Sequence, residues 1–245
     1  MELLYLDNQD FRVASMEHYA WLLYTVAGAL FWIRLGLRAP TEDAKRTIAL
    51  YMSLTGVVFW VYASCVMIAI GNAPLQSLIP LHLCYFLNLL FPLLIWKKRI
   101  AAFDWIYPIV MAGCLQALFT PDLDQTAPHY YNLRYWFVHA GLIHTMLYVI
   151  VVFGFRPTFM GIFKCILAIN VYGFMVIPVN YLLNTNFLYL REPAKGSMME
   201  ALGPWPWYIL YIELLMFVFF AVVYLPFAMS PIIRRYVKRS DENGF

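Results

Sequence analysis

The stretch LIPLHLCYFLNLLFPLLIW, residues 78–96, decides the fold class of this protein. It is an apolar run of the length that a helix needs to cross a bilayer, roughly 20 residues. Because the apolar residues do not alternate with polar ones, the run predicts a membrane helix rather than a strand of a barrel. Two polar or reactive side chains, His82 and Cys84, interrupt it near its start, and polar groups at membrane depth are costly unless they serve a purpose.

The rest of the chain has the composition of a polytopic membrane protein. Of its 245 residues, 63% are hydrophobic and 13% are charged, and the mean hydropathy is +0.67. Soluble domains are about 45–50% apolar and about 25% charged. A net charge of +3 gives no reason to expect a nucleic-acid partner, and the acidic N-terminus MELLYLDNQDF lacks the basic start of a cleavable signal peptide. We therefore predict an all-α protein in which residues 1–245 form a single transmembrane helical domain.

The chain contains seven segments of spanning length, separated by short polar or proline- and glycine-containing stretches. These segments lie at about 18–37, 47–70, 78–96, 100–119, 135–154, 159–183 and 205–230. The prediction is a seven-transmembrane helix bundle.

The distribution of lysine and arginine predicts its orientation. With seven spans and a cytoplasmic C-terminus, 13 of the 17 basic residues lie on the cytoplasmic side, in residues 34–46, 97–99, 156–164 and 234–239. The other four, at positions 12, 134, 191 and 195, lie outside. Because cytoplasmic loops are enriched in basic residues, this split favours an N-terminus outside the cell and a C-terminus in the cytoplasm.

Polar and reactive side chains collect at one predicted depth, near the outer face. They are His82 and Cys84 in the third segment, Tyr135, His139 and His144 in the fifth, Asn180, Asn184 and Asn186 around the end of the sixth, and Glu213 in the seventh. Taken singly, a cysteine can act as a small hydrophobe and an asparagine can join two helices. Their shared depth predicts a polar pocket that opens to the outer leaflet or the outer aqueous face.

Helical spacing restricts which of these side chains share a face. Tyr135 and His139 are four residues apart and lie on one face. His139 and His144 are about 140° apart around a helix, and His82 and Cys84 about 200° apart. We therefore expect only one of His139 and His144 to reach Cys84 as a base, and His82 to contact the substrate or its head group instead.

A cysteine with a histidine from another helix suits nucleophilic acyl transfer, in which the imidazole takes the thiol proton and the thiolate attacks an ester. Asparagine amides can hold the oxyanion. We expect no metal and no cofactor, since the four cysteines lack zinc-type spacing and Glu213 is the only deep carboxylate.

Four stretches resemble the YwaF-like family of bacterial integral membrane proteins. They are IPLHLC (79–84), RYWFVH (134–139), VNYLLNTNFLYLREP (179–193) and LGPWPWYILYIE (202–213). That family is similar to a eukaryotic endoplasmic-reticulum acyltransferase that remodels ether phospholipids with a catalytic cysteine and histidine, which match Cys84 and His139 by position. The resemblance implies an acyltransferase or transacylase acting on phospholipids or lysophospholipids, in a bacterial cytoplasmic (inner) membrane.

A second hypothesis is a non-catalytic lipid- or solute-binding membrane subunit of a larger complex, in which the amides and imidazoles bind a head group. A transporter is a third, but the chain shows no inverted repeat. Contact between the Cys84 sulfur and a His139 nitrogen would favour the enzyme. A gap of more than about 8 Å, well beyond hydrogen-bond reach, would favour the binding subunit.

Overall fold

The structure is a computed structural model that describes residues 10–194 and 198–242, with side chains for residues 10–194 and 199–229. Every regular element in these ranges is a helix, so the all-α prediction is confirmed. In chain order they are α1 (Met16–Leu37), α2 (Glu42–Ala69), α3 (Leu75–Leu78), α4 (Leu83–Trp96), η2 (Ile100–Ala102), α5 (Phe103–Ile109), η3 (Val110–Cys114), α6 (Leu115–Phe119), α7 (Tyr130–Val151), α8 (Phe159–Leu182), η4 (Phe187–Tyr189), η5 (Met198–Leu202) and α9 (Trp207–Glu242).

Six helical segments of the described chain are long and apolar enough to cross a membrane: Met16–Leu37, Glu42–Ala69, Leu75–Trp96, Ile100–Phe119, Phe159–Leu182 and Trp207–Met229. The second begins five residues before its apolar run, because Thr41 caps its N-terminus and Glu42 and Asp43 occupy the first turn. The protein is therefore an integral membrane protein with at least these helices available to span the bilayer.

Helix α7 covers the remaining predicted segment, but it is not among these six. It contains Arg134, His139 and His144, and 15 of its 22 residues are buried. It packs against α1, α2 and α4. A helix surrounded by protein does not need a fully apolar surface, which explains why α7 has the length of a span without the composition.

The third predicted segment is not one continuous helix. A single turn, α3, is followed by extended backbone at Ile79 and His82, and α4 starts only at Leu83. Pro80 lies in this break, and the Tyr172 hydroxyl of α8 donates a hydrogen bond of 3.0 Å to the Leu81 carbonyl oxygen. Non-helical backbone at membrane depth is tolerated where it is shielded by protein or lines a cavity. The break places Cys84 in the first turn of α4.

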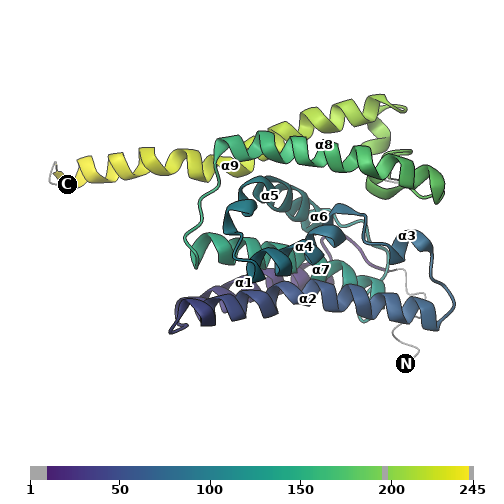
Figure 1. Ribbon diagram of the computed structural model, residues 1–245, viewed down its shortest axis with the longest axis horizontal. Coiled ribbons are helices and arrows are strands. Elements are labelled where there is room, and N and C mark those ends of the chain that lie inside the picture. The colour runs from purple at the N-terminus through teal and green to yellow at the C-terminus, as the bar shows by residue number, and fades with distance from the viewer. Residues whose placement is uncertain (1–9, 195–197, 243–245) are drawn as a thin grey trace.

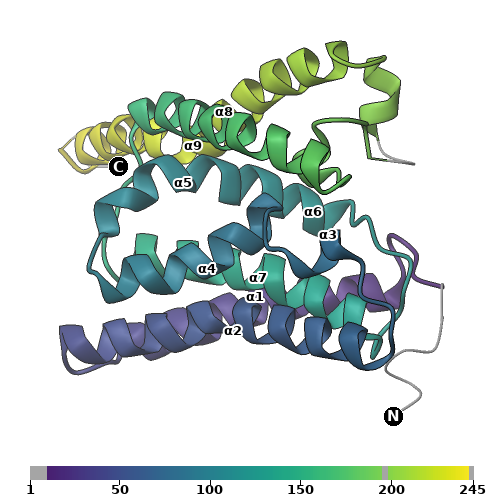
Figure 2. The same cartoon turned by 45° about the vertical axis from the view of Figure 1, so that its right-hand side comes forward.

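The helices form two groups (Figure 1). Helices α1, α2, α4 and α7 pack together, α8 pairs with α9, and α5 lies between the groups and contacts both α8 and α9. The α1–α2 turn, the α4–η2 and α7–α8 connections and the C-terminal end of α9 lie at one end of the bundle (Figure 2). The opposite end, called here the α3 end, carries α3 and the segment that joins α8 to α9.

The basic residues used to predict orientation mostly belong to the end opposite α3, where the connections with Arg38, Lys45 and Lys97 lie. Lys195 lies outside the described residues, as do the side chains of Arg234, Arg235, Lys238 and Arg239.

Candidate functional site

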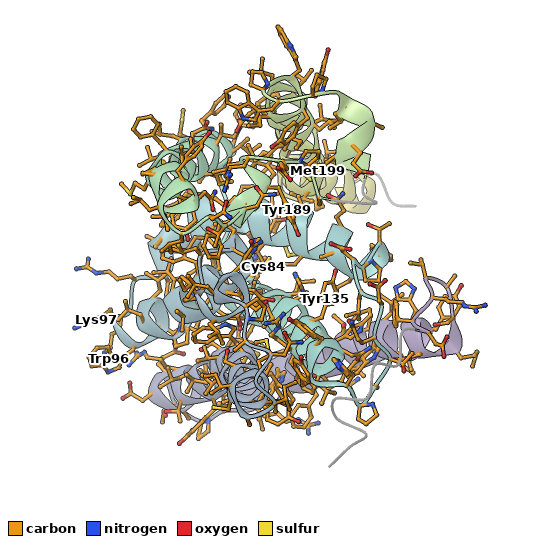
Figure 3. All side chains as sticks on the ribbon, turned by 90° about the vertical axis from the view of Figure 1, so that its right-hand side faces the viewer. Cys84, Trp96, Lys97, Tyr135, Tyr189 and Met199 are labelled. Carbon is orange, nitrogen blue, oxygen red and sulfur yellow. The ribbon has the colours of Figure 1, made fainter. Side chains whose placement is uncertain are left out.

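A cavity of about 1180 Å³ lies at the α3 end of the bundle. Its wall comes from α3, α4, η3, α6, α7, α8, η4 and α9 and from the loop after α6, and it combines polar groups with a larger apolar surface. Five of the nine predicted site residues line it: His82, Cys84, Tyr135, His139 and Glu213. In Figure 3, Cys84 and Tyr135 approach the centre from below, and Tyr189 and Met199 lie above them on the segment between α8 and α9.

Cys84 is the second residue of α4 and is partly exposed to the cavity. The α4 N-terminus has no side-chain cap. The free N–H groups and the positive dipole end of such a first turn stabilise a thiolate. The thiol lies close enough to the side chains of His139 on α7 and Cys114 on η3 to interact with both.

His139 is held in one orientation. Its Nδ1 lies 2.7 Å from the Tyr135 carbonyl oxygen, one turn earlier on α7. A carbonyl oxygen only accepts, so Nδ1 carries the proton and Nε2 carries the lone pair of the neutral ring. The Tyr135 ring packs 4.4 Å from the imidazole, and its hydroxyl donates to the Ala117 carbonyl oxygen at 2.7 Å. The imidazole is therefore prepared to accept a proton at Nε2.

Asn88 joins the two elements that carry Cys84 and His139. Its side-chain amide donates to the Cys84 carbonyl oxygen at 2.8 Å and to the Val138 carbonyl oxygen at 3.2 Å. The α2 residue beside it is Gly56, where an added Cβ would lie 1.8 Å from Asn88 Oδ1. The close approach of α2 therefore requires glycine. Sequence reasoning missed Asn88, although it lies one turn after Cys84 in the opening stretch.

His82 lies on the cavity wall, with its hydrogen-bond partner on α3 and two ring partners on η4. Gln76 Oε1 accepts from the Asn186 backbone N–H at 3.0 Å, so its amide nitrogen donates to His82 Nε2 at 3.3 Å. The neutral His82 ring then carries its own proton on Nδ1. The ring packs between Phe187 and Tyr189, with centroid distances of 5.4 and 5.6 Å.

The three predicted asparagines shape the loop after α8. The fully buried Asn180 bonds through its Oδ1 and Nδ2 to the Phe187 backbone and accepts from the Thr185 hydroxyl. Asn184 has a φ of 49° and accepts from Arg191, and Asn186 bonds the backbone of Arg191 and Glu192. None of the three lines the cavity.

The other two predicted residues have partners elsewhere. His144 Nε2 bonds the Thr25 carbonyl oxygen at 2.8 Å in the α1–α7 interface, beside Gly28, and does not line the cavity. Glu213 lines the cavity but accepts from the Asn170 amide at 3.2 Å, not from a histidine or Arg134.

Arg134 is a second residue that sequence reasoning did not place in the site. It lines the cavity, yet only 6% of its surface is exposed. Arg134 lies one residue before the predicted segment 135–154, so an arginine at the edge of an apolar segment was the available signal. In η4, which is not part of a spanning helix, burial raises the pKa of the Tyr189 phenol. This cavity residue therefore remains a neutral hydroxyl.

No group of three histidine, cysteine or acidic side chains within the described ranges is arranged to hold a metal ion. The site combines a thiol, imidazoles, phenols, one guanidinium and the carboxyl groups of Asp122, Asp124 and Glu213. These groups suit nucleophilic and acid–base chemistry on an amphiphilic molecule.

Comparison with known proteins places the chain in a family. The family model described as the TMEM164 family matches residues 13–224. No curated protein and no solved structure matches the chain. With the match extending from α1 well into α9, and thus over the whole cavity wall, this protein belongs to the TMEM164 family of membrane proteins.

Proposed function

We propose that the protein is a phospholipid acyltransferase in which Cys84 is the nucleophile and His139 is the general base. The observation that carries the proposal is the placement of these two side chains, from α4 and α7, within interaction distance of each other on the wall of one cavity. The resemblance of IPLHLC and RYWFVH to the YwaF-like proteins, and through them to a phospholipid-remodelling enzyme, supports the same assignment.

In the first half-reaction, His139 Nε2 takes the Cys84 proton while the sulfur attacks an ester carbonyl of a phospholipid. The bond between the carbonyl carbon and the glycerol oxygen breaks, the imidazolium protonates the leaving oxygen, and a thioester remains on Cys84. In the second, the hydroxyl of a lysophospholipid loses its proton to Nε2 and attacks the thioester. The acyl chain moves to the acceptor, and the imidazolium returns the proton to the thiolate.

The oxyanion of each tetrahedral intermediate needs donors. Asn180, Asn184 and Asn186, which sequence reasoning assigned to this role, are occupied by the loop after α8. The uncapped first turn of α4 offers backbone N–H groups directly beside Cys84 instead.

The cavity suits a lipid in size and surface. At about 1180 Å³ it exceeds the roughly 300–1,000 Å³ of a pocket for a drug-sized ligand. Apolar side chains such as Ile169, Phe174 and Met216 line the part formed by α8 and α9. Acyl chains fit this part, while the head group meets the polar wall.

We further propose that α7 is the seventh span, shielded by α1, α2 and α4, and that the α3 end faces the outer side of the membrane. The basic residues at the opposite end support this orientation. The bacterial cytoplasmic membrane as the location rests on the resemblance. Accessibility of single cysteines placed at Asn72 and Lys98 to a membrane-impermeant maleimide tests the topology, since only Asn72 is expected to react from outside.

The activity is tested with purified protein in nanodiscs that contain a phospholipid donor and an isotope-labelled lysophospholipid. Wild-type protein and Cys65→Ala, which removes an exposed cysteine remote from the cavity, are expected to transfer the acyl chain. Cys84→Ala is expected to abolish transfer and the thioester. If a folded Cys84→Ala protein transfers acyl chains at the wild-type rate, the proposal is wrong. If no variant transfers but all bind lipid, the binding subunit is the better description.

A further inference from the structure

Arg134 is the most buried cationic side chain on the cavity wall. It lies in the first half of α7, with 6% of its surface exposed, and it lines the cavity that holds Cys84 and His139. A buried guanidinium is retained at a cost of several kcal/mol unless its charge and its N–H groups have partners.

The partners within the protein are few. Among residues 10–194 and 199–229, the sole hydrogen bond of its side chain is a long one of 3.4 Å from Nη1 to the Ser77 carbonyl oxygen. Its Nε–H is buried with no hydrogen-bond partner. The ion pairs among the described side chains join other residues, namely Lys45 to Glu42, Arg46 to Asp43 and Lys164 to Asp104. A positive charge therefore lines the cavity without an ion-pair partner among the side chains that the structure describes.

The acidic residues of the same wall do not supply that anion. Asp122, Asp124 and Glu213 line the cavity, but none forms an ion pair with Arg134. The Glu213 carboxylate accepts a hydrogen bond from the Asn170 amide. The guanidinium instead packs on two aromatic faces, 5.2 Å from the Tyr85 centroid and 4.5 Å from the Tyr131 centroid. Stacking of this kind fixes the plane of the guanidinium and leaves its N–H edge available to an anion.

Arg134 lies near the reacting groups of the proposed site. Arg134 is close enough to interact electrostatically with His82 and His139. It is also five residues before His139 on the same helix, about 7.5 Å along the axis and about 140° around it. Both side chains nevertheless line the same cavity. In a glycerophospholipid the phosphate and the ester carbonyls are joined through adjacent glycerol carbons, so an anion at Arg134 leaves an ester within reach of Cys84.

We propose that Arg134 is the anchor for the phosphate ester of the ligand, held by the guanidinium edge between Tyr85 and Tyr131 and positioned beside Cys84 and His139. The proposal rests on the proposed function for the view that the ligand is a lipid substrate. The anion site itself depends only on the buried, unbalanced guanidinium, and a fork-shaped guanidinium suits a phosphate better than a point charge does.

The test measures binding rather than turnover, so it uses Cys84→Ala protein in detergent micelles and native mass spectrometry. Three probes separate the contributions: palmitoyl lysophosphatidylcholine, monopalmitoylglycerol, which lacks the phosphate, and glycerol 3-phosphate, which lacks the chain. Arg134→Gln is expected to weaken the binding of lysophosphatidylcholine about 10- to 100-fold, the effect of losing a charge-assisted hydrogen bond. Its effect on the affinity for monopalmitoylglycerol is expected to be less than about twofold.

Two further variants sharpen the comparison. Arg134→Lys keeps the charge and loses the fork, so an intermediate loss is expected, and it carries the test if Arg134→Gln does not fold. The matched control is Arg34→Gln, because Arg34 is an exposed arginine of α1 in a shallow groove outside the cavity. This change should alter the affinity for neither lipid. Binding of glycerol 3-phosphate that depends on Arg134 would show a site for soluble phosphate esters as well. Its failure while lysophosphatidylcholine binds would restrict the site to lipid head groups.

Equal affinity of the wild-type cavity for the two lipids, or equal weakening of both by Arg134→Gln, overturns the anchor. Neither result bears on acyl transfer by Cys84, because the binding protein lacks that thiol. Conversely, absence of acyl transfer by the wild-type protein would leave the phosphate preference to be judged by these affinities alone.

Discussion

The side-chain amide of Asn88 donates a hydrogen bond of 2.8 Å to the backbone carbonyl oxygen of Cys84, and a second of 3.2 Å reaches Val138 on α7. One buried amide therefore fixes the spacing between the helix that carries the proposed nucleophile and the helix that carries the proposed base. Reactions that depend on this spacing are sensitive to displacements of about 1 Å.

Replacing Asn88 with alanine should lower kcat about 10- to 100-fold while KM changes little, because the reacting groups separate but the cavity wall remains. The same change should reduce the free energy of unfolding by about 1–3 kcal/mol. Steady-state kinetics and thermal unfolding in nanodiscs measure the two effects. The exposed Asn72 provides the control Asn72→Ala, and a parallel rise in KM would contradict a positioning role.

Gly56→Ala should disturb the same contact from the other side. The added Cβ would lie 1.8 Å from Asn88 Oδ1, so the amide or helix α2 must move. Overpacking of this kind costs about 1–3 kcal/mol of stability. Gly173→Ala is the matched control, since its Cβ would meet the nearest atom at 3.8 Å. Equal melting temperatures for the two variants would show that α2 adjusts freely.

His139→Gln should reduce the rate of acyl transfer about 10²- to 10⁴-fold, the usual contribution of a general base. His144→Gln should instead affect stability, because His144 bonds the Thr25 carbonyl oxygen between α1 and α7. Single-turnover formation of the thioester on Cys84 distinguishes them. A large rate loss in a stable His144→Gln protein, with His139→Gln active, would identify His144 as the base.

Asn180→Ala should lower the free energy of unfolding rather than the rate of acyl transfer. It leaves the Phe187 backbone N–H and carbonyl and the Thr185 hydroxyl without their buried partner, at a cost of about 1–3 kcal/mol. Asn184→Gly should cost little, since glycine adopts the φ of 49° readily. Thermal unfolding with and without lysophosphatidylcholine checks both. A stable Asn180→Ala protein that has lost lipid binding would instead place its amide on the substrate.

The sequence predicted the helical class and the positions of the helices well, because apolar run length depends only on the thickness of the bilayer. Pro80 made an irregular start of the third segment plausible from the sequence, but the sequence did not show how the chain breaks between α3 and α4. The Tyr172 hydroxyl of α8, 91 positions along the chain, supports the break. Helix α7 was predicted by its length, whereas its burial among α1, α2 and α4 explains why it tolerates Arg134 and two histidines.

The candidate site was predicted in part. The sequence gives the depth of a side chain along a span but not the direction in which that side chain points. Depth along a span follows from sequence position, so the collection of polar residues near one end was visible in advance. The direction of each side chain is set by neighbouring helices, which is why Asn180 faces its own loop and Asn88, at a less conspicuous depth, holds Cys84.

What the sequence determined by itself is a helical membrane protein with a thiol and an imidazole at similar depth, since hydropathy, basic-residue distribution and helical period are local properties. Only the tertiary structure decided that Cys84 lies in the first turn of α4 beside His139 and that Tyr135 orients that imidazole. It also decided that Arg134 lines the cavity with no ion-pair partner in the described part of the chain. These relationships join α3, α4 and α7 across about 50 residues of chain. They arise from packing, which no local pattern specifies.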